Sequence, residues 1–152
     1  MGILIDNNDK NLNIICGCCG ECSILRFCEY GEAIYKGDIY LPFYNKFNKK
    51  EIKKLEKSLI LSKFDINMVY DALNHIINEK DGYSFSIPIT NIKEDIYIEF
   101  IKYGEGKDLS FIAINFYTNY KNYIKEKITY DIILFDEMVN KILEFLKIKF
   151  NY

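Results

Sequence analysis

The sequence is poor in the residues that most often carry chemistry or bind nucleic acid. It has no tryptophan, two prolines and one histidine, His75, so a zinc site built on a pair of histidines is excluded. Arg26 is the only arginine, which leaves almost nothing for the bidentate recognition of phosphate or guanine. Neither the G-x-G-x-x-G pattern nor a P-loop occurs. These absences give no support to a nucleotide-binding enzyme.

Features that direct a chain to a membrane or to secretion are also missing. No apolar run approaches the roughly 18–20 residues of a membrane span. The start of the chain lacks a positively charged segment followed by a long apolar one, and Asp6 stands where a myristoylation site needs Ser or Thr. Five cysteines, an odd number, without a secretory leader fit a reducing compartment. We therefore expect a cytoplasmic protein with no membrane partner.

What is present is typical of a globular domain. The 152 residues are 49% hydrophobic and 28% charged, which predicts a single domain over 1–152 with a core of its own. The net charge of −2 argues against a duplex-DNA binder, which needs clustered cations. Tyr, Phe, Ile, Lys and Asn are abundant, and because AT-rich codons encode them, we attribute much of this bias to an AT-rich bacterial or phage genome.

Turn residues and helical spacing divide the first half of the chain into strands followed by helices. Two or three antiparallel strands are expected between Leu12 and Tyr44, where short apolar runs alternate with Gly and Asn. A first helix should begin at Asn48, since Glu51 completes a capping box. A second helix should begin at Asp65 and end near Gly82. The apolar positions that support the two helices are Ile52, Leu55, Leu59 and Ile60 in the first, and Val69, Ala72, Leu73, Ile76 and Ile77 in the second.

The second half predicts three more strands and a long helix. The strands are expected at 83–89, 95–103 and 109–117, whereas residues 118–130 fit a strand and a helix equally well. A helix is expected from Asp131 to about Phe150, with Asp136 and Glu137 favouring its start. The fold class is then α+β: a single antiparallel sheet of about five to six strands, with a helical pair inserted mid-chain and a long C-terminal helix. This order, ββ(β)-αα-βββ-α, is similar to that of profilin-like and PAS-like folds.

The most unusual local feature is a cluster of cysteines. Cys16-Gly17-Cys18-Cys19-Gly20-Glu21-Cys22 contains two interlocked C-x2-C spacings, and Cys28 follows. This spacing lets two thiolates reach one ion, so Zn or an iron–sulfur cluster could be held by Cys16, Cys18, Cys19, Cys22 and Cys28. However, structural zinc sites use two separated pairs, and a strand would send neighbouring cysteines to opposite faces. Packing as small apolar residues is the favoured interpretation, and no cofactor is expected.

Three further patterns favour ordinary structural roles over sites. His75 is predicted at the edge of a helix, without a local partner that would make it a general base. Glu105-Gly106-Lys107 resembles a nuclease motif but fits a hairpin turn. A lysine-rich face at 46–57 and the tyrosines of 117–123, which lie near Lys121, Lys125 and Lys127, resemble a single-strand nucleic-acid surface. A solvated helix face explains the lysines as well, and nucleic acid is not the expected partner.

The functional hypotheses follow from this balance. The favoured one is a small protein-binding module without catalysis, such as an immunity or anti-defence inhibitor from an AT-rich bacterium or phage. Its positive support is the abundance of tyrosine, which provides contact area together with a polar tip. The alternatives are a thiolate-metal or thiol-redox protein that uses the Cys16–Cys28 cluster, and a small-ligand sensor with an aromatic pocket. The oligomeric state and the identity of the partner do not follow from the sequence.

Overall fold

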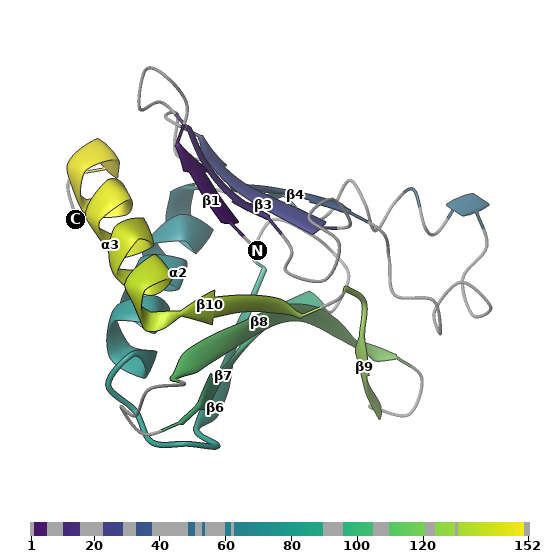
Figure 1. The fold of residues 1–152 in the computed structure, drawn as a ribbon. Helices are drawn as coiled ribbons and strands as arrows, with labels where there is room; N and C mark the ends of the chain where they lie inside the picture. The colour runs from purple at the N-terminus through teal and green to yellow at the C-terminus, as the bar shows by residue number, and fades with distance from the viewer. Residues whose placement is uncertain are drawn as a thin grey trace.

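The fold is α+β, and the residues that the structure describes include two antiparallel sheets and two long helices (Figure 1). The computed structural model describes residues 2–5, 11–15, 23–28, 33–37, 49–50, 53, 60–61, 63–89, 96–104, 110–120, 124–129 and 131–150. In Figure 1 the two sheets lie one above the other, and the helices pack beside them. The chain forms the first sheet, then one helix, then the second sheet, and ends in the other helix.

The first sheet is a meander in which each strand pairs with the next in the sequence. Its strands, in spatial order, are β1 (Gly2–Ile5), β2 (Asn11–Ile15), β3 (Ser23–Cys28), β4 (Ala33–Gly37) and β5 (Ile60–Leu61). Leu12, Ile14, Leu25 and Phe27 are buried, so alternate positions of β2 and β3 face the core. Period-two alternation of this kind is what a sheet with one covered face requires.

The second sheet is built around two long strands. Its strands are β6 (Ser84–Pro88), β7 (Ile96–Tyr103), β8 (Phe111–Tyr120), β9 (Ile124–Lys127) and β10 (Ile132–Phe135). The order is β10-β8-β7-β6, and β9 also pairs with β8. Since β8 pairs with β7 on one side, β9 and β10 lie end to end along its other side. At the opposite edge, β6 has no second neighbour among the strands that the structure describes.

The two helices carry charges that suit their ends. Helix α2 (Lys63–Ile76) has Asp65 in its first turn and His75 in its last. Helix α3 (Asp136–Phe150) begins with Asp136 and Glu137 and has Lys147 and Lys149 in its last turn. Acidic groups near the start of a helix and basic groups near its end interact favourably with the helix dipole. Each such interaction stabilises the helix by about 0.3–1 kcal/mol at exposed sites.

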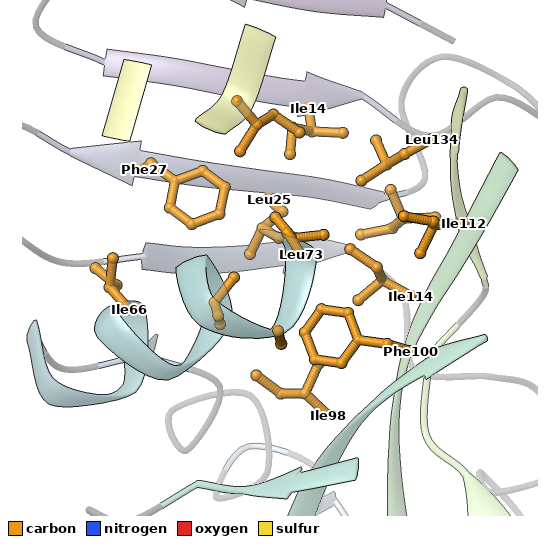
Figure 2. Packing of buried hydrophobic residues seen from close by; sticks show 14 of the residues in the cluster. Ile14, Leu25, Phe27, Ile66, Leu73, Ile98, Phe100, Ile112, Ile114 and Leu134 are labelled. Atoms are coloured by element: carbon orange, nitrogen blue, oxygen red, sulfur yellow. The ribbon is translucent and has the colours of Figure 1, made fainter. Parts of the chain in front are cut away.

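One hydrophobic core joins both sheets and both helices (Figure 2). Leu25 and Phe27 of β3 reach it from the first sheet, and Phe100 and Ile114 reach it from the second. Leu73 of α2 lies between these two groups in the figure. The core residues contributed by the helices are Ile66, Val69, Ala72, Leu73 and Ile76 of α2, and Val139, Ile142, Phe145 and Leu146 of α3. The apolar positions predicted for the second helix therefore do face the core.

The α+β class and the long C-terminal helix are confirmed, but the prediction of a single sheet is wrong. Two sheets form, each with its own set of antiparallel pairs. Ile60, predicted on the first helix, lies instead in β5 and pairs with Ile34 of β4. The helix expected from Asp131 begins only at Asp136, because Ile132–Phe135 form β10 and pair with β8. The ambiguous stretch 118–130 contains the end of β8 and the strand β9.

Some predicted features fall outside the described residues. These are the cysteines at 16–22, the Glu105–Lys107 turn and most of the first helix. Within that helix, Lys49, Lys50 and Lys53 are described, with helical backbone and exposed side chains. Of the helices described, none is both long enough and apolar enough to cross a membrane.

Candidate functional site

An open groove runs between α2 and β6. It has a volume of about 300 Å³ and is largely apolar. Its walls are Met68, Asp71, Ala72 and His75 from α2, and Phe85 and Ile87 from β6. The helical residues recur at spacings of three and four, which places them along one side of α2. The groove is thus formed by one side of a helix and the edge strand of a sheet.

The alternation of β6 explains which of its side chains enter the groove. Side chains at successive strand positions point to opposite faces of the sheet. Phe85 and Ile87 line the groove, and Ile87 is buried. Ser86, which lies between them and is half-buried, and the flanking Ser84 and Pro88, which are exposed, belong to the opposite face. A short strand with two serines and a proline on one face therefore presents its apolar face to α2.

The same register determines which backbone groups of β6 face away from the sheet. Ile89 donates its N–H to the carbonyl of Ile96 (3.0 Å), and Tyr83 accepts from the N–H of Lys102 (2.8 Å). In an antiparallel pair only alternate residues exchange hydrogen bonds with the neighbour. The residues that alternate with Tyr83 and Ile89, namely Ser84 and Ser86, therefore direct their N–H and C=O groups outward. Pro88 contributes a carbonyl there and no donor.

The end of the groove carries a small aromatic and charged cluster. Nε2 of His75 lies 3.3 Å from the hydroxyl of Tyr83 and 3.3 Å from Oε1 of Glu79. The His75 ring meets the rings of Tyr83 and Phe85 edge-on, at centroid distances of 5.7 and 6.2 Å. Tyr83 is still 38% exposed. His75 is thus a helix-edge residue, as predicted, but Glu79, four residues further along the chain, is a local partner that the sequence analysis did not anticipate.

The helix wall of the groove is fixed at its C-terminal end by a buried lysine. Nζ of Lys102 donates to the carbonyl of Ile77 (3.0 Å) and to Oδ1 of Asp136 (3.2 Å). The hydroxyl of Ser110 donates to the same carboxylate oxygen (3.2 Å). The Lys102 side chain is 1% exposed and that of Asp136 is 37% exposed. One ammonium group therefore connects the chain just after α2 to the first residue of α3.

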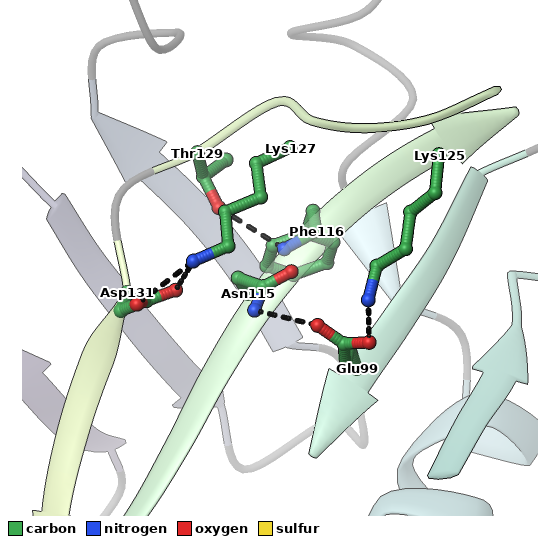
Figure 3. A network of polar contacts seen from close by, with 7 residues as sticks. All are labelled: Glu99, Asn115, Phe116, Lys125, Lys127, Thr129 and Asp131. Carbon is green, nitrogen blue, oxygen red and sulfur yellow. Dashed lines mark hydrogen bonds and ion pairs between the residues drawn. The ribbon is translucent and has the colours of Figure 1, made fainter. Parts of the chain in front are cut away.

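A second polar cluster lies on the opposite face of the second sheet (Figure 3). Glu99 of β7 is buried, and its carboxylate accepts hydrogen bonds from Nδ2 of Asn115 and from Nζ of Lys125. Lys125 also lies over the ring of Tyr117, 4.9 Å from its centroid, and Tyr117 stacks on Tyr97. Three strands contribute to this cluster, so it holds β9 against β7 and β8.

A break in the pairing along β8 explains the rest of this polar network. Lys127 pairs with Tyr117 and Ile132 with Ile114, so five steps along the chain from β9 to β10 match three along β8. The two extra residues form a bulge. There the N–H of Phe116 donates to Oγ1 of Thr129 (3.1 Å), and Nζ of Lys127 bonds Asp131 (3.0 Å) (Figure 3). The N–H of Ile128 still donates to the carbonyl of Phe116 (2.7 Å), so one backbone bond and one side-chain bond hold this stretch against β8.

The predicted site residues are only partly placed. Cys28 lies half-buried in β3, while Cys16, Cys18, Cys19 and Cys22 lie outside the described residues, so the metal hypothesis stays a prediction. Among the residues that the structure does describe, no group of three or more His, Cys, Asp and Glu side chains could hold a metal ion. Lys125 and Tyr117 do come together, but in a contact that also includes the buried Glu99.

The groove itself was not predicted from the sequence. Two of its features were nevertheless visible there: the proline at 88, typical of an edge strand, and the alternation of Ser with Phe and Ile before it. The pairing of β6 with α2 across the groove depends on tertiary packing and has no local signature. Comparison with known proteins adds no assignment, because no family model, no curated protein and no solved structure matches the chain.

Proposed function

We propose that this protein is a small protein-binding module without catalysis, and that it binds its partner at the α2–β6 groove. The observation that carries the proposal is the position of an edge strand beside an apolar groove. Exposed strand edges are ready templates for pairing with another chain. Apolar hollows with a few polar groups are the usual form of binding sites. Here the two features occupy the same place.

The side chains around the groove are suited to binding a protein partner. Among the residues that the structure describes, the ionisable side chains lining the groove are Asp71 and His75, and His75 already contacts Tyr83 and Glu79. Tyr83 offers the combination of an apolar ring and a polar tip that is enriched in interface cores. An immunity or anti-defence role would be one use of such a module, and it is supported by composition alone.

Site-specific photo-crosslinking tests the proposal. A photoreactive phenylalanine analogue is placed at one of two groove positions: Asp71, which lines the groove, or Ser84, which is exposed on the edge strand β6 beside it. The control position is Glu144, exposed on α3. We expect one protein to crosslink from the two groove positions and not from the control. That protein is then purified, and its affinity for the wild type and for Asp71→Arg is measured. A central contact predicts a loss of about 30-fold.

Two outcomes would contradict the proposal. One is equal crosslinking from the groove and from Glu144, which indicates non-specific proximity. The other is a purified partner that binds Asp71→Arg as tightly as the wild type, since its site would then lie elsewhere. Because Asp71 is an exposed helical residue, the substitution should leave the fold intact, and a thermal melt of the variant checks this.

A further inference from the structure

We infer that the partner contributes an extended segment that adds to β6 as an antiparallel strand, with alternating apolar side chains in the groove and a Lys or Arg opposite Asp71. This inference rests on the proposed function and specifies the chemistry of the partner at the same site. It follows from three separate features: the backbone groups of β6, the shape of the groove and the charge of its rim.

The backbone of β6 provides the hydrogen bonds for strand addition. Ser84 and Ser86 each direct an N–H and a C=O away from β7, as the bonds of Tyr83 and Ile89 to β7 establish. The carbonyl of Pro88 faces the same way. An incoming strand would therefore make up to five main-chain hydrogen bonds without breaking any in the sheet. In this mode the main chain gives affinity and alternate side-chain pockets give specificity.

The groove determines which side chains of the partner are recognised. Residues directly opposite each other in an antiparallel pair place their side chains on the same face of the sheet. The two partner residues opposite Phe85 and Ile87 would thus point into the groove, and the residue between them would point away. The groove is at the low end of the size range of ligand pockets and is mostly apolar, which suits two aliphatic side chains.

The acidic rim of the groove, formed by Asp71 and Glu79, favours a cationic partner residue next to the two aliphatic ones. Asp71 is exposed and lines the groove, and Glu79 contacts His75 at its end. Within the described part of the chain, no Lys or Arg lines the groove. An approaching segment therefore meets an acidic rim, and a cationic side chain two positions from an aliphatic one would complement it.

A second copy of this chain suits the groove less well than a separate segment. Pairing of β6 with itself across a two-fold axis through Ser86 would place Ser84 opposite Pro88, which lacks the N–H that the pair needs. The same axis would bring two identical acidic rims together, because an isologous interface repeats each patch. Proline on an edge strand commonly protects against such self-pairing.

A peptide experiment tests the inference directly. A library of short peptides, randomised at every position, is displayed and selected against the full-length protein. We expect enriched sequences in which two aliphatic residues are separated by one residue and accompanied by Lys or Arg. The best peptide is then synthesised as a series with one backbone N-methyl group at each position in turn. Methylation should weaken binding about tenfold at every second position and little at the positions between.

Protein variants provide the matched comparison. Ser86→Pro removes an outward N–H, whereas Ser86→Ala keeps it, so only the proline variant should lose the peptide, by about tenfold or more. Asp71→Arg should shift selection away from basic sequences. If Ser86→Pro does not fold, the series of N-methylated peptides still tests strand addition, since the protein in that experiment is unchanged.

The possible failures are distinguishable. A partner that crosslinks at Asp71 but whose binding segment shows no two-residue period on N-methylation would overturn strand addition and leave the binding module standing. Enrichment of helical sequences with apolar residues three and four apart would do the same. A concentration-dependent dimer that Ser86→Pro abolishes would identify a second copy as the occupant and overturn the proposed segment. Absence of any groove-directed crosslink would remove the proposed function itself.

Discussion

The two partners of the ion pair between Lys102 and Asp136 should differ sharply in what their loss costs. We expect Asp136→Asn to destabilise the protein more than Lys102→Met, although both changes remove the same charge pair. The reason is burial: the Lys102 side chain is 1% exposed, whereas that of Asp136 is 37% exposed. Without its carboxylate partner, the ammonium group stays enclosed. Without the lysine, the carboxylate keeps its access to water.

The magnitudes follow from this asymmetry. Removing one partner of a buried pair and leaving the other charge uncompensated costs about 3–5 kcal/mol, and the partial exposure here places Asp136→Asn near the lower end. Lys102→Met leaves the carbonyl of Ile77 without its donor, at about 1–2 kcal/mol, and the buried methionine offsets part of that loss. In the double variant no buried charge remains, so its stability should be close to that of Lys102→Met alone.

Urea unfolding of the four proteins, followed by circular dichroism, measures these differences as a double-mutant cycle. The expected result is a free energy of unfolding that falls by about 3 kcal/mol in Asp136→Asn and by about half of that or less in the other two variants. If Lys102→Met were the more damaging single change, the ammonium group would not depend on Asp136, and the account of this contact would be wrong. Ser110→Ala, which removes the other bond to Asp136, serves as a control for the loss of one neutral hydrogen bond.

Three further predictions concern the core, a turn and the cysteines. Phe100→Ala empties a fully buried position in the core, and it should lower the free energy of unfolding, measured in urea, by about 3–5 kcal/mol. Gly82→Ala should cost about 1 kcal/mol and Gly82→Asn less, because φ is +82° and an added Cβ would meet nothing within 4 Å, so the penalty is purely conformational. For the predicted thiolate site, native mass spectrometry of chelator-free protein should show the apo mass if the cysteines only pack. A mass excess of zinc or an iron–sulfur cluster, lost on replacing Cys16 and Cys19, would establish the site instead.

The sequence predicted elements well where one periodicity dominated. Strands β6, β7 and β8 and the start of helix α2 were expected within about three residues of their bounds, because apolar spacing of two, or of three and four, dominates there. The end of α2 was placed near Gly82, whereas the helix ends at Ile76. The segment Ile132–Phe135 was misassigned to the helix that follows it. Four consecutive apolar or aromatic residues fit the start of a buried helix as well as a strand, and only the pairing with β8 decides between them.

The number of sheets could not be predicted, because it depends on which strands meet. Ile60 matches the apolar stripe of the predicted first helix, yet it pairs with β4 as part of β5 and completes the first sheet. The strands before α2 and the strands after it therefore form two separate antiparallel sheets, which share the hydrophobic core. The groove could not be predicted for the same reason. Asp71 belongs to α2 and Phe85 to β6, and the two residues become neighbours only through tertiary packing.

The same packing has a consequence for binding, since both walls of the groove are fixed before any partner arrives. Leu73 and Ile76 anchor α2 in the core, Lys102 holds its C-terminal end, and β6 is paired along its length with β7. A preformed site leaves only the partner to be ordered, which lowers the cost of association. Loosening the end of α2 should therefore weaken binding of the selected peptide, and Asp136→Asn should do so under conditions where it is still folded. Phe27→Leu, a core change in β3, is the control, because it lowers stability but leaves the contacts of Lys102 at the end of α2 in place. Equal loss of binding in both variants would mean that affinity follows global stability, and preorganisation of α2 would not be the reason.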